Sequence, residues 1–216
     1  MPIKWLMENA EAVVRYRTQI ELMEINKKEQ LQENLTAVLA LPQTLKRMDM
    51  LRNMNYSRVH GSDSTHLENI LPMLNDFGLH YGVDAVRLII RDNLDIKKVV
   101  TGLVGTFGSC SPMQPGYSYY DKIIAYPFLL RSRIPINGLL DFAIDRINTI
   151  YDFTRHRDFN IYDDAANYKG IPKPFTDRPI VKPEIAYSDM CRLPMIYDIV
   201  TLAEVYHRVP SEIQEK

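Results

Sequence analysis

Hydrophobic residues recur at intervals of three and four along most of this chain, which is the spacing of an apolar face on an α-helix. A short helical piece at the N-terminus precedes Asn9, the predicted N-cap of the next helix. That helix carries its apolar face on Ala12, Val13, Tyr16, Ile20 and Met23. A second helical region spans 27–53. Because Pro42 removes an amide donor and clashes with the preceding turn, we expect a break near Leu41 and a new helix over 43–52.

The next predicted helix follows a polar turn. Thr65 and Glu68 have the spacing of a capping box. The helix places its apolar face on Leu67, Ile70, Leu71, Leu74 and Phe77. Pro72 within it predicts a kink or a later start, and either Gly78 or Gly82 ends it.

The middle and end of the chain predict further helices. Apolar runs in 83–107 would suit β-strands by composition, but their spacing fits a helix at least as well, so we expect two short helices. Residues 108–118 contain two prolines and two glycines and predict a loop. Helices are then expected over 119–133 and 135–155, and a last one over 195–208.

One predicted loop, 158–194, is much longer than the others and carries prolines at 172, 174, 179, 183 and 194. A loop of that length is uncommon in a compact domain unless it is a lid, a binding loop or a linker. Helices joined otherwise by short connections, without βαβ alternation, predict an all-α fold of packed antiparallel helical hairpins. We expect a partial (α/α) toroid or a short α-solenoid, as a single helical domain over 1–216.

Composition excludes several classes of protein. The chain has 216 residues, 46% of them hydrophobic and 25% charged, as in a globular protein. A net charge of −1 gives no field that would recruit nucleic acid or an anionic membrane, and no segment is apolar enough to span a membrane. Two distant cysteines, Cys110 and Cys191, are expected to be reduced thiols in a cytoplasmic protein, with a disulfide as the alternative. They are too few for a cysteine-rich zinc site, and no cofactor is expected.

Two segments, WLMENAEAVVRYRTQIELM (5–23) and VHGSDSTHLENILPMLNDFGL (59–79), resemble helices of bacterial proteins with the (α/α) toroid of terpenoid cyclases and prenyltransferases. The first segment also resembles a HEAT-type hairpin. The toroid resemblance implies helices around a concave pocket. The aspartate-rich motif and the repeated Gln-Trp motifs of the cyclases are absent, since Trp5 is the only tryptophan. The zinc ligands of protein prenyltransferases have no match either, so the chemistry of neither group transfers.

A polar turn is the first candidate site. His60, Asp63, His66 and Glu68 lie within nine residues, and imidazoles with carboxylates suit acid–base chemistry or a metal ion. We predict that His60 transfers a proton, that Asp63 orients it, and that His66 and Glu68 contact the substrate. As alternatives, Asp63, Thr65 and Glu68 only cap a helix, or the turn binds a metal, although no His-x-x-x-His spacing is present.

Tyr117, Tyr120 and Asp163 are the other predicted substrate contacts. Tyrosines offer ring faces and hydroxyls for a pocket wall. Asp163 belongs to the stretch RHRDFNIYDD (155–164), which could bind a cation or an anion or could simply end a helix with favourable charges. Cys110, close to the tyrosines in sequence, is either an inert buried thiol or a nucleophile.

Two functions from different classes fit these patterns. In the first, the hairpins surround a pocket that the loop 158–194 closes, and the protein binds or transforms a small molecule. In the second, a HEAT-like scaffold holds a protein partner on its concave face and the polar turns are helix caps. Neither function involves nucleic acid or a membrane, and the sequence does not decide the oligomeric state.

Overall fold

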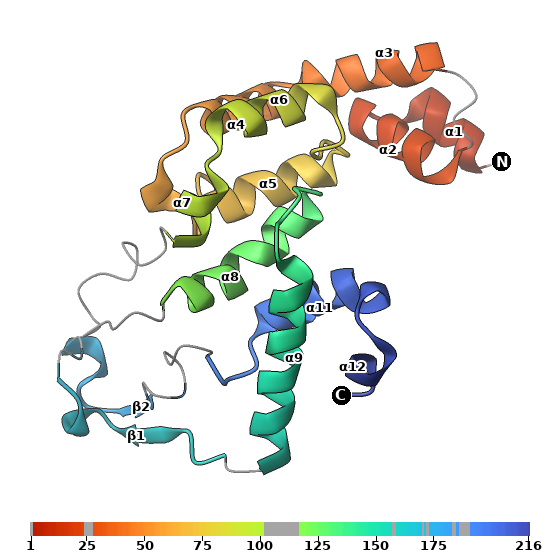
Figure 1. Ribbon diagram of the computed structural model, residues 1–216. Coiled ribbons are helices and arrows are strands. Elements are labelled where there is room, and N and C mark those ends of the chain that lie inside the picture. The colour runs from red at the N-terminus through yellow and green to blue at the C-terminus, as the bar shows by residue number, and fades with distance from the viewer. Residues whose placement is uncertain are drawn as a thin grey trace. The chain divides into compact units, whose positions relative to one another are not determined.

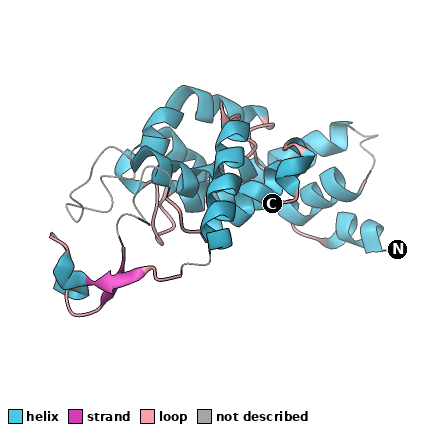
Figure 2. Cartoon of the chain, turned by 60° about the horizontal axis from the view of Figure 1, so that its bottom comes forward, coloured by secondary structure: helices cyan, strands magenta, loops and turns pink. Residues whose placement is uncertain are grey.

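The structure is a computed structural model. It describes residues 2–23, 28–101, 117–156, 159–169, 171, 173–182, 185 and 191–216. The side chains of 57, 101, 117–121 and 174 lie outside that description. Regular structure in the described residues is helical apart from one two-stranded sheet (Figures 1 and 2), which confirms the predicted mostly helical fold. The toroid or solenoid arrangement stays a prediction.

The chain divides into two compact units. Unit 1 comprises Met1–Asn55, Gly61–Asp95 and Arg131–Ile134, and unit 2 comprises Tyr56–His60, Ile96–Leu130 and Pro135–Lys216. We describe each unit by itself, and the single domain over 1–216 stays a prediction. Within the described residues, no helix combines the length and apolar character needed to cross a membrane.

Unit 1 is built from helices labelled in Figure 1 as α1 (Pro2–Asn9), α2 (Ala12–Leu22), α3 (Lys28–Leu39), α4 (Pro42–Arg52), α5 (Leu67–Asp76) and α6 (Asp84–Asn93). α2 packs against α1 and α3, and α4 packs against α3, α5 and α6. The predicted break at Leu41 is confirmed, because Pro42 occupies the first turn of α4, where its missing N–H costs nothing. α5 buries the stripe that its spacing predicts: Leu67, Ile70, Leu71 and Leu74.

The predicted N-cap of α2 is wrong. Asn9 is the last residue of α1, and Glu11 holds the position before α2. The Asn9 side-chain amide donates to the carbonyl of Trp5 at 3.0 Å, one turn back in α1. Its polar group therefore serves a helix C-terminus, which the sequence pattern does not distinguish from an N-cap.

Unit 2 contains α7 (Ile96–Thr101), nearly all of α8 (Tyr117–Arg131), α9 (Leu139–His156), α11 (Ile196–Val205) and α12 (Ser211–Gln214). α9 packs against both α11 and α12. α9 begins four residues later than the predicted Pro135, because Gly138 has a φ of 70° that a helix cannot contain. Short 3₁₀ turns lie at Tyr56–Arg58, Ala165–Asn167, Lys173–Phe175 and Tyr206–Arg208.

The region 158–194, predicted as a loop, contains a small antiparallel hairpin, drawn in magenta in Figure 2. Strand β1 (Tyr162–Asp164) pairs with β2 (Pro179–Val181), and Asp164 lies opposite Pro179. Strands of three residues are too short for a recognisable alternation of apolar and polar positions. The hairpin therefore escaped the sequence analysis.

Candidate functional site

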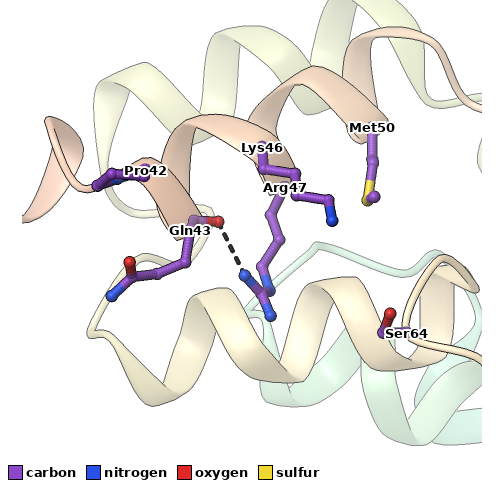
Figure 3. A pocket seen from close by; sticks show the side chains of 6 residues that line it. All are labelled: Pro42, Gln43, Lys46, Arg47, Met50 and Ser64. Atoms are coloured by element: carbon purple, nitrogen blue, oxygen red, sulfur yellow. Dashed lines mark hydrogen bonds between the residues drawn. The ribbon is translucent and has the colours of Figure 1, made fainter.

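A cleft opens in unit 1 between α4 and the turn that precedes α5 (Figure 3). Its volume is about 380 Å³, within the range of roughly 300–1,000 Å³ typical of small-molecule sites. Five of its lining residues lie on one face of α4, and the sixth belongs to the turn: Pro42, Gln43, Lys46, Arg47, Met50 and Ser64. None of the six was among the site residues predicted from the sequence.

Lys46 and Arg47 give the cleft its positive charge. Figure 3 shows both side chains leaving α4 on the side that faces α5. In the part of the chain that the structure describes, neither has a carboxylate oxygen within 4.0 Å. Lys46 is exposed and Arg47 is half-buried. The cleft therefore holds two cations without a counter-ion from these residues.

Among the residues that the structure describes, the Arg47 guanidinium has only uncharged partners. Its Nη1 donates to the carbonyl of Gln43 at 2.9 Å, one turn back in α4. Its Nε and Nη2 donate to the sulfur of Met73 on α5, at 3.1 Å and 2.8 Å. A thioether is a weak acceptor and carries no charge, and these contacts use three of the five guanidinium N–H groups. The other two N–H groups have no acceptor among the described residues.

Ser64 reaches the cleft because the turn around it is held by its own hydrogen bonds. The Asp63 carboxylate accepts from the backbone N–H of Thr65 at 2.7 Å. The side-chain amide of Asn69, on the first turn of α5, donates to the carbonyls of Gly61 and Asp63, each at 2.8 Å. The turn is thus fixed to α5, and Ser64 lines the same cleft as the two cations of α4.

The capping box predicted from Thr65 and Glu68 is wrong. α5 begins at Leu67, and His66 precedes it without a side-chain cap bond. The Glu68 carboxylate accepts from the backbone N–H of Gly61 at 3.0 Å. Glu68 therefore closes the turn, and the helix starts later than its sequence suggests because the turn occupies its first predicted residues.

The predicted catalytic residues lie in different units. His60 belongs to unit 2, where its ring lies 6.1 Å from the ring of Tyr197 in an edge-to-face arrangement. Asp63 belongs to unit 1. His66 Nδ1 lies 3.0 Å from the carbonyl of Asp63, and since a carbonyl only accepts, Nδ1 is the protonated nitrogen. The roles predicted for these side chains stay predictions.

The predicted contacts Tyr117 and Tyr120 lie on the first turn of α8, and their side chains are outside the described residues. Cys110 is also outside them. The other cysteine, Cys191, is buried, and burial raises the pKa of its thiol. A raised pKa keeps the thiol protonated at neutral pH, so Cys191 is a poor nucleophile.

Asp163 lies in β1, where its carboxylate accepts three hydrogen bonds. The donors are the backbone N–H of Asp164 at 2.8 Å, the amide of Asn167 at 2.9 Å and the hydroxyl of Tyr168 at 3.0 Å. The bond from Asp164 is the main reason that the pKa of Asp163 is lowered, and those from Tyr168 and Asn167 add to it. These bonds organise the hairpin, and substrate contact by Asp163 stays a prediction.

A buried ion pair in unit 2 was also missed. Arg146 of α9 and Asp198 of α11 are 1% and 4% exposed. The guanidinium Nε and Nη2 donate to the two carboxylate oxygens at 2.8 Å and 2.6 Å. Arg146 also donates to the carbonyls of Cys191 and Leu193, and the N–H of Met195 donates to Asp198. Arg146 and Asp198 neutralise each other's charge, and their hydrogen bonds hold the chain before α11 against α9.

One sequence signal could have revealed that pair: Arg146 stands within the apolar stripe of its helix, three residues after Ala143 and four before Ile150. Lys46 and Arg47 gave no such signal, because adjacent cations on a helix usually face solvent. No group of three His, Cys, Asp or Glu side chains in the described ranges could hold a metal ion. The chain matches no protein-family model, no curated protein and no solved structure.

Proposed function

We propose that unit 1 binds a small molecule through an anionic group, a phosphate or a carboxylate, in the cleft between α4 and the turn containing Ser64. The observation that carries this proposal is the pair Lys46 and Arg47, which share the cleft and lack a carboxylate partner among the described residues. A half-buried guanidinium with only neutral acceptors gains from an anion, because charge-assisted hydrogen bonds are the stronger ones.

Other features of the cleft fit the same ligand. The Ser64 hydroxyl and the Gln43 amide supply neutral donors, and the two remaining N–H groups of Arg47 can bind an oxyanion. Leu41, before α4, offers no side-chain acceptor to the first N–H groups of the helix. The N-terminal half of α4 therefore adds a favourable dipole to the two cations. The apolar side chains of Pro42 and Met50 line the cleft and would contact an apolar part of the ligand.

The proposal retains the small-molecule function predicted from the sequence and places the ligand in a different site. Proton transfer by His60, closure by 158–194 and the toroid resemblance stay predictions. The HEAT-like scaffold stays the alternative. One observation favours it: Ile196 and Ile199 on α11 are 70% and 65% exposed, and exposed apolar side chains that lie together are typical of protein interfaces.

Titration calorimetry with inorganic phosphate, sulfate and acetate tests the anion site. We expect saturable binding that Lys46→Met weakens by about tenfold, the equivalent of one charge-assisted hydrogen bond. Arg52→Ala is the matched control, because Arg52 is an exposed cation on the same helix and outside the cleft. Equal affinities for the wild type and Lys46→Met, or an equal loss in Arg52→Ala, would overturn the proposal.

A further inference from the structure

We propose that Met73 is an oxidation site that controls the anion site: a hydroperoxide converts its thioether to a sulfoxide, whose oxygen then engages Arg47 in place of the ligand. This inference rests on the proposed function, since it concerns regulation of the same cleft. It assigns a role to the contact between the Met73 sulfur and the Arg47 guanidinium.

The geometry singles out Met73 among the described methionines. Its sulfur lies 2.8 Å and 3.1 Å from two nitrogens of the Arg47 guanidinium. The side chain is half-buried, so a small oxidant in water has access to it. Met48 is only 5% exposed and belongs to the core. Met50 lines the cleft and is half-buried, but its sulfur accepts no hydrogen bond from a cation in the described residues.

The chemistry needs no group beyond the oxidant. A lone pair of the Met73 sulfur attacks one oxygen of hydrogen peroxide, the S–O bond forms and the O–O bond breaks. The departing hydroxide takes the proton from the transferred oxygen and leaves as water. Sulfur loses two electrons and the peroxide gains them, giving methionine sulfoxide. Arg47 N–H groups already occupy one side of the sulfur, so the lone pair that attacks the peroxide is the one directed away from the guanidinium.

The product changes the acceptor that faces Arg47. A sulfoxide oxygen is a polar, strong acceptor, whereas a thioether sulfur is a weak one. The new oxygen forms on the side of the sulfur that Arg47 does not occupy, and a rotation of the Met73 side chain brings it to the guanidinium, whose N–H groups it binds more strongly than the sulfur does. Its partial negative charge would also repel an anion from the cleft. Oxidation therefore replaces an external anion with an internal acceptor and lowers the affinity of the site.

Hydrogen peroxide treatment of the full chain, followed by titration with inorganic phosphate, tests the inference. Peptide mass spectrometry should find the added oxygen on Met73, and the Kd for phosphate should rise about tenfold, as for one lost charge-assisted hydrogen bond. Met73→Leu should keep its affinity after peroxide, whereas the control Met54→Leu, which changes a half-buried methionine of unit 1 outside the cleft, should lose affinity as the wild type does. Met73→Gln, whose amide oxygen imitates the sulfoxide, should bind phosphate weakly without peroxide.

The outcomes separate this inference from the proposed function. If the untreated protein does not bind phosphate, the anion site itself is wrong and the inference falls with it. If the untreated protein binds and the oxidised protein binds equally well, only the inference is overturned. The same conclusion follows if Met73→Leu loses affinity on oxidation, or if Met73 stays unmodified while Met50 is oxidised.

Discussion

Two arginines of this chain meet opposite environments. Arg146 is buried in unit 2, where a carboxylate and two backbone carbonyls surround its guanidinium. Arg47 is half-buried at a cleft of unit 1, where its partners are a thioether and one carbonyl. Both hold their guanidinium in a fixed place, but only Arg146 has its counter-ion within the described residues.

This difference separates a structural charge from one suited to binding. A buried cation with a bidentate carboxylate leaves nothing for a ligand to gain, and it makes the fold depend on the pair. A cation beside a cleft with neutral partners adds little to stability and keeps its charge available. Breaking the Arg146 pair should therefore lower the stability of the fold, whereas substituting Arg47 should lower the affinity for an anion.

The largest effect should come from Asp198→Ala. Arg146 would be left as a buried charge without a carboxylate, which costs about 3–5 kcal/mol in comparable pairs. Chemical denaturation followed by circular dichroism should show unit 2 losing that stability. Asp141→Ala, which removes an exposed acid from α9, is the control. A loss below about 1 kcal/mol, the range of exposed pairs, would contradict the structural role.

The double substitution Arg146→Met with Asp198→Leu sharpens the same point. It removes both charges and keeps apolar volume, so stability should return close to that of the wild type. The double variant and Asp198→Ala are compared in one denaturation series. If the double variant is as unstable as the single one, the hydrogen bonds to Cys191 and Leu193 matter more than charge balance.

Arg47→Met should show the reverse pattern. We expect the stability of unit 1 to change by less than about 1 kcal/mol, because the substitution removes only contacts to neutral acceptors. Phosphate affinity should fall by at least about tenfold, because the charged guanidinium and its paired N–H donors are lost. Thermal unfolding and calorimetry on the same sample make the comparison. A large loss of stability with unchanged affinity would place Arg47 in the same class as Arg146.

A smaller effect is expected at Thr201, which is 2% exposed and follows Asp198 on the inner side of α11. Its hydroxyl has no hydrogen-bond partner in the residues described. Thr201→Val keeps the shape and removes the unsatisfied group, so stability should be unchanged or rise by up to about 1 kcal/mol. Denaturation midpoints measure it, and a loss above that size would indicate an unrecognised partner of the hydroxyl.

The smallest effect concerns pH and the hairpin. The folded pKa of Asp163 is lowered by its bond from the N–H of Asp164, with further contributions from Tyr168 and Asn167. A lowered folded pKa gives stability that is present above the unfolded pKa of about 4 and is lost as the pH falls through the folded value. A carboxyl titration by NMR should place Asp163 below the ordinary aspartate range. Tyr168→Phe should move the value upward, and no movement would remove that hydroxyl as a cause.

Helix faces show what the sequence could and could not predict. The buried stripe of α5 follows from its spacing because apolar residues alone decide which side turns inward. α11 has the opposite arrangement, with Asp198 buried and Ile199 exposed. A carboxylate is buried there because Arg146, far away in the sequence, neutralises it. Spacing within one helix contains no information about that partner.

The candidate cleft was unpredictable for a similar reason. Lys46 and Arg47 follow the usual pattern of a solvent-facing helix, and Ser64 and Met73 are ordinary residues in their own segments. Only folding brings the turn and α5 beside α4. The sequence did locate the polar turn itself, from its density of histidine and acidic residues, although it assigned the wrong partners to Thr65 and Glu68.

The hairpin has a consequence for engineering the chain. Because Asp164 and Pro179 lie opposite each other, the residues between them leave and return at nearly the same point, about 5 Å apart. A shorter connection would have to keep Asn167 and Tyr168, whose side chains donate to Asp163 in β1. The same position could equally accept a fluorescent or affinity module whose own termini are close together, which would attach a reporter to unit 2 without touching α9 or α11.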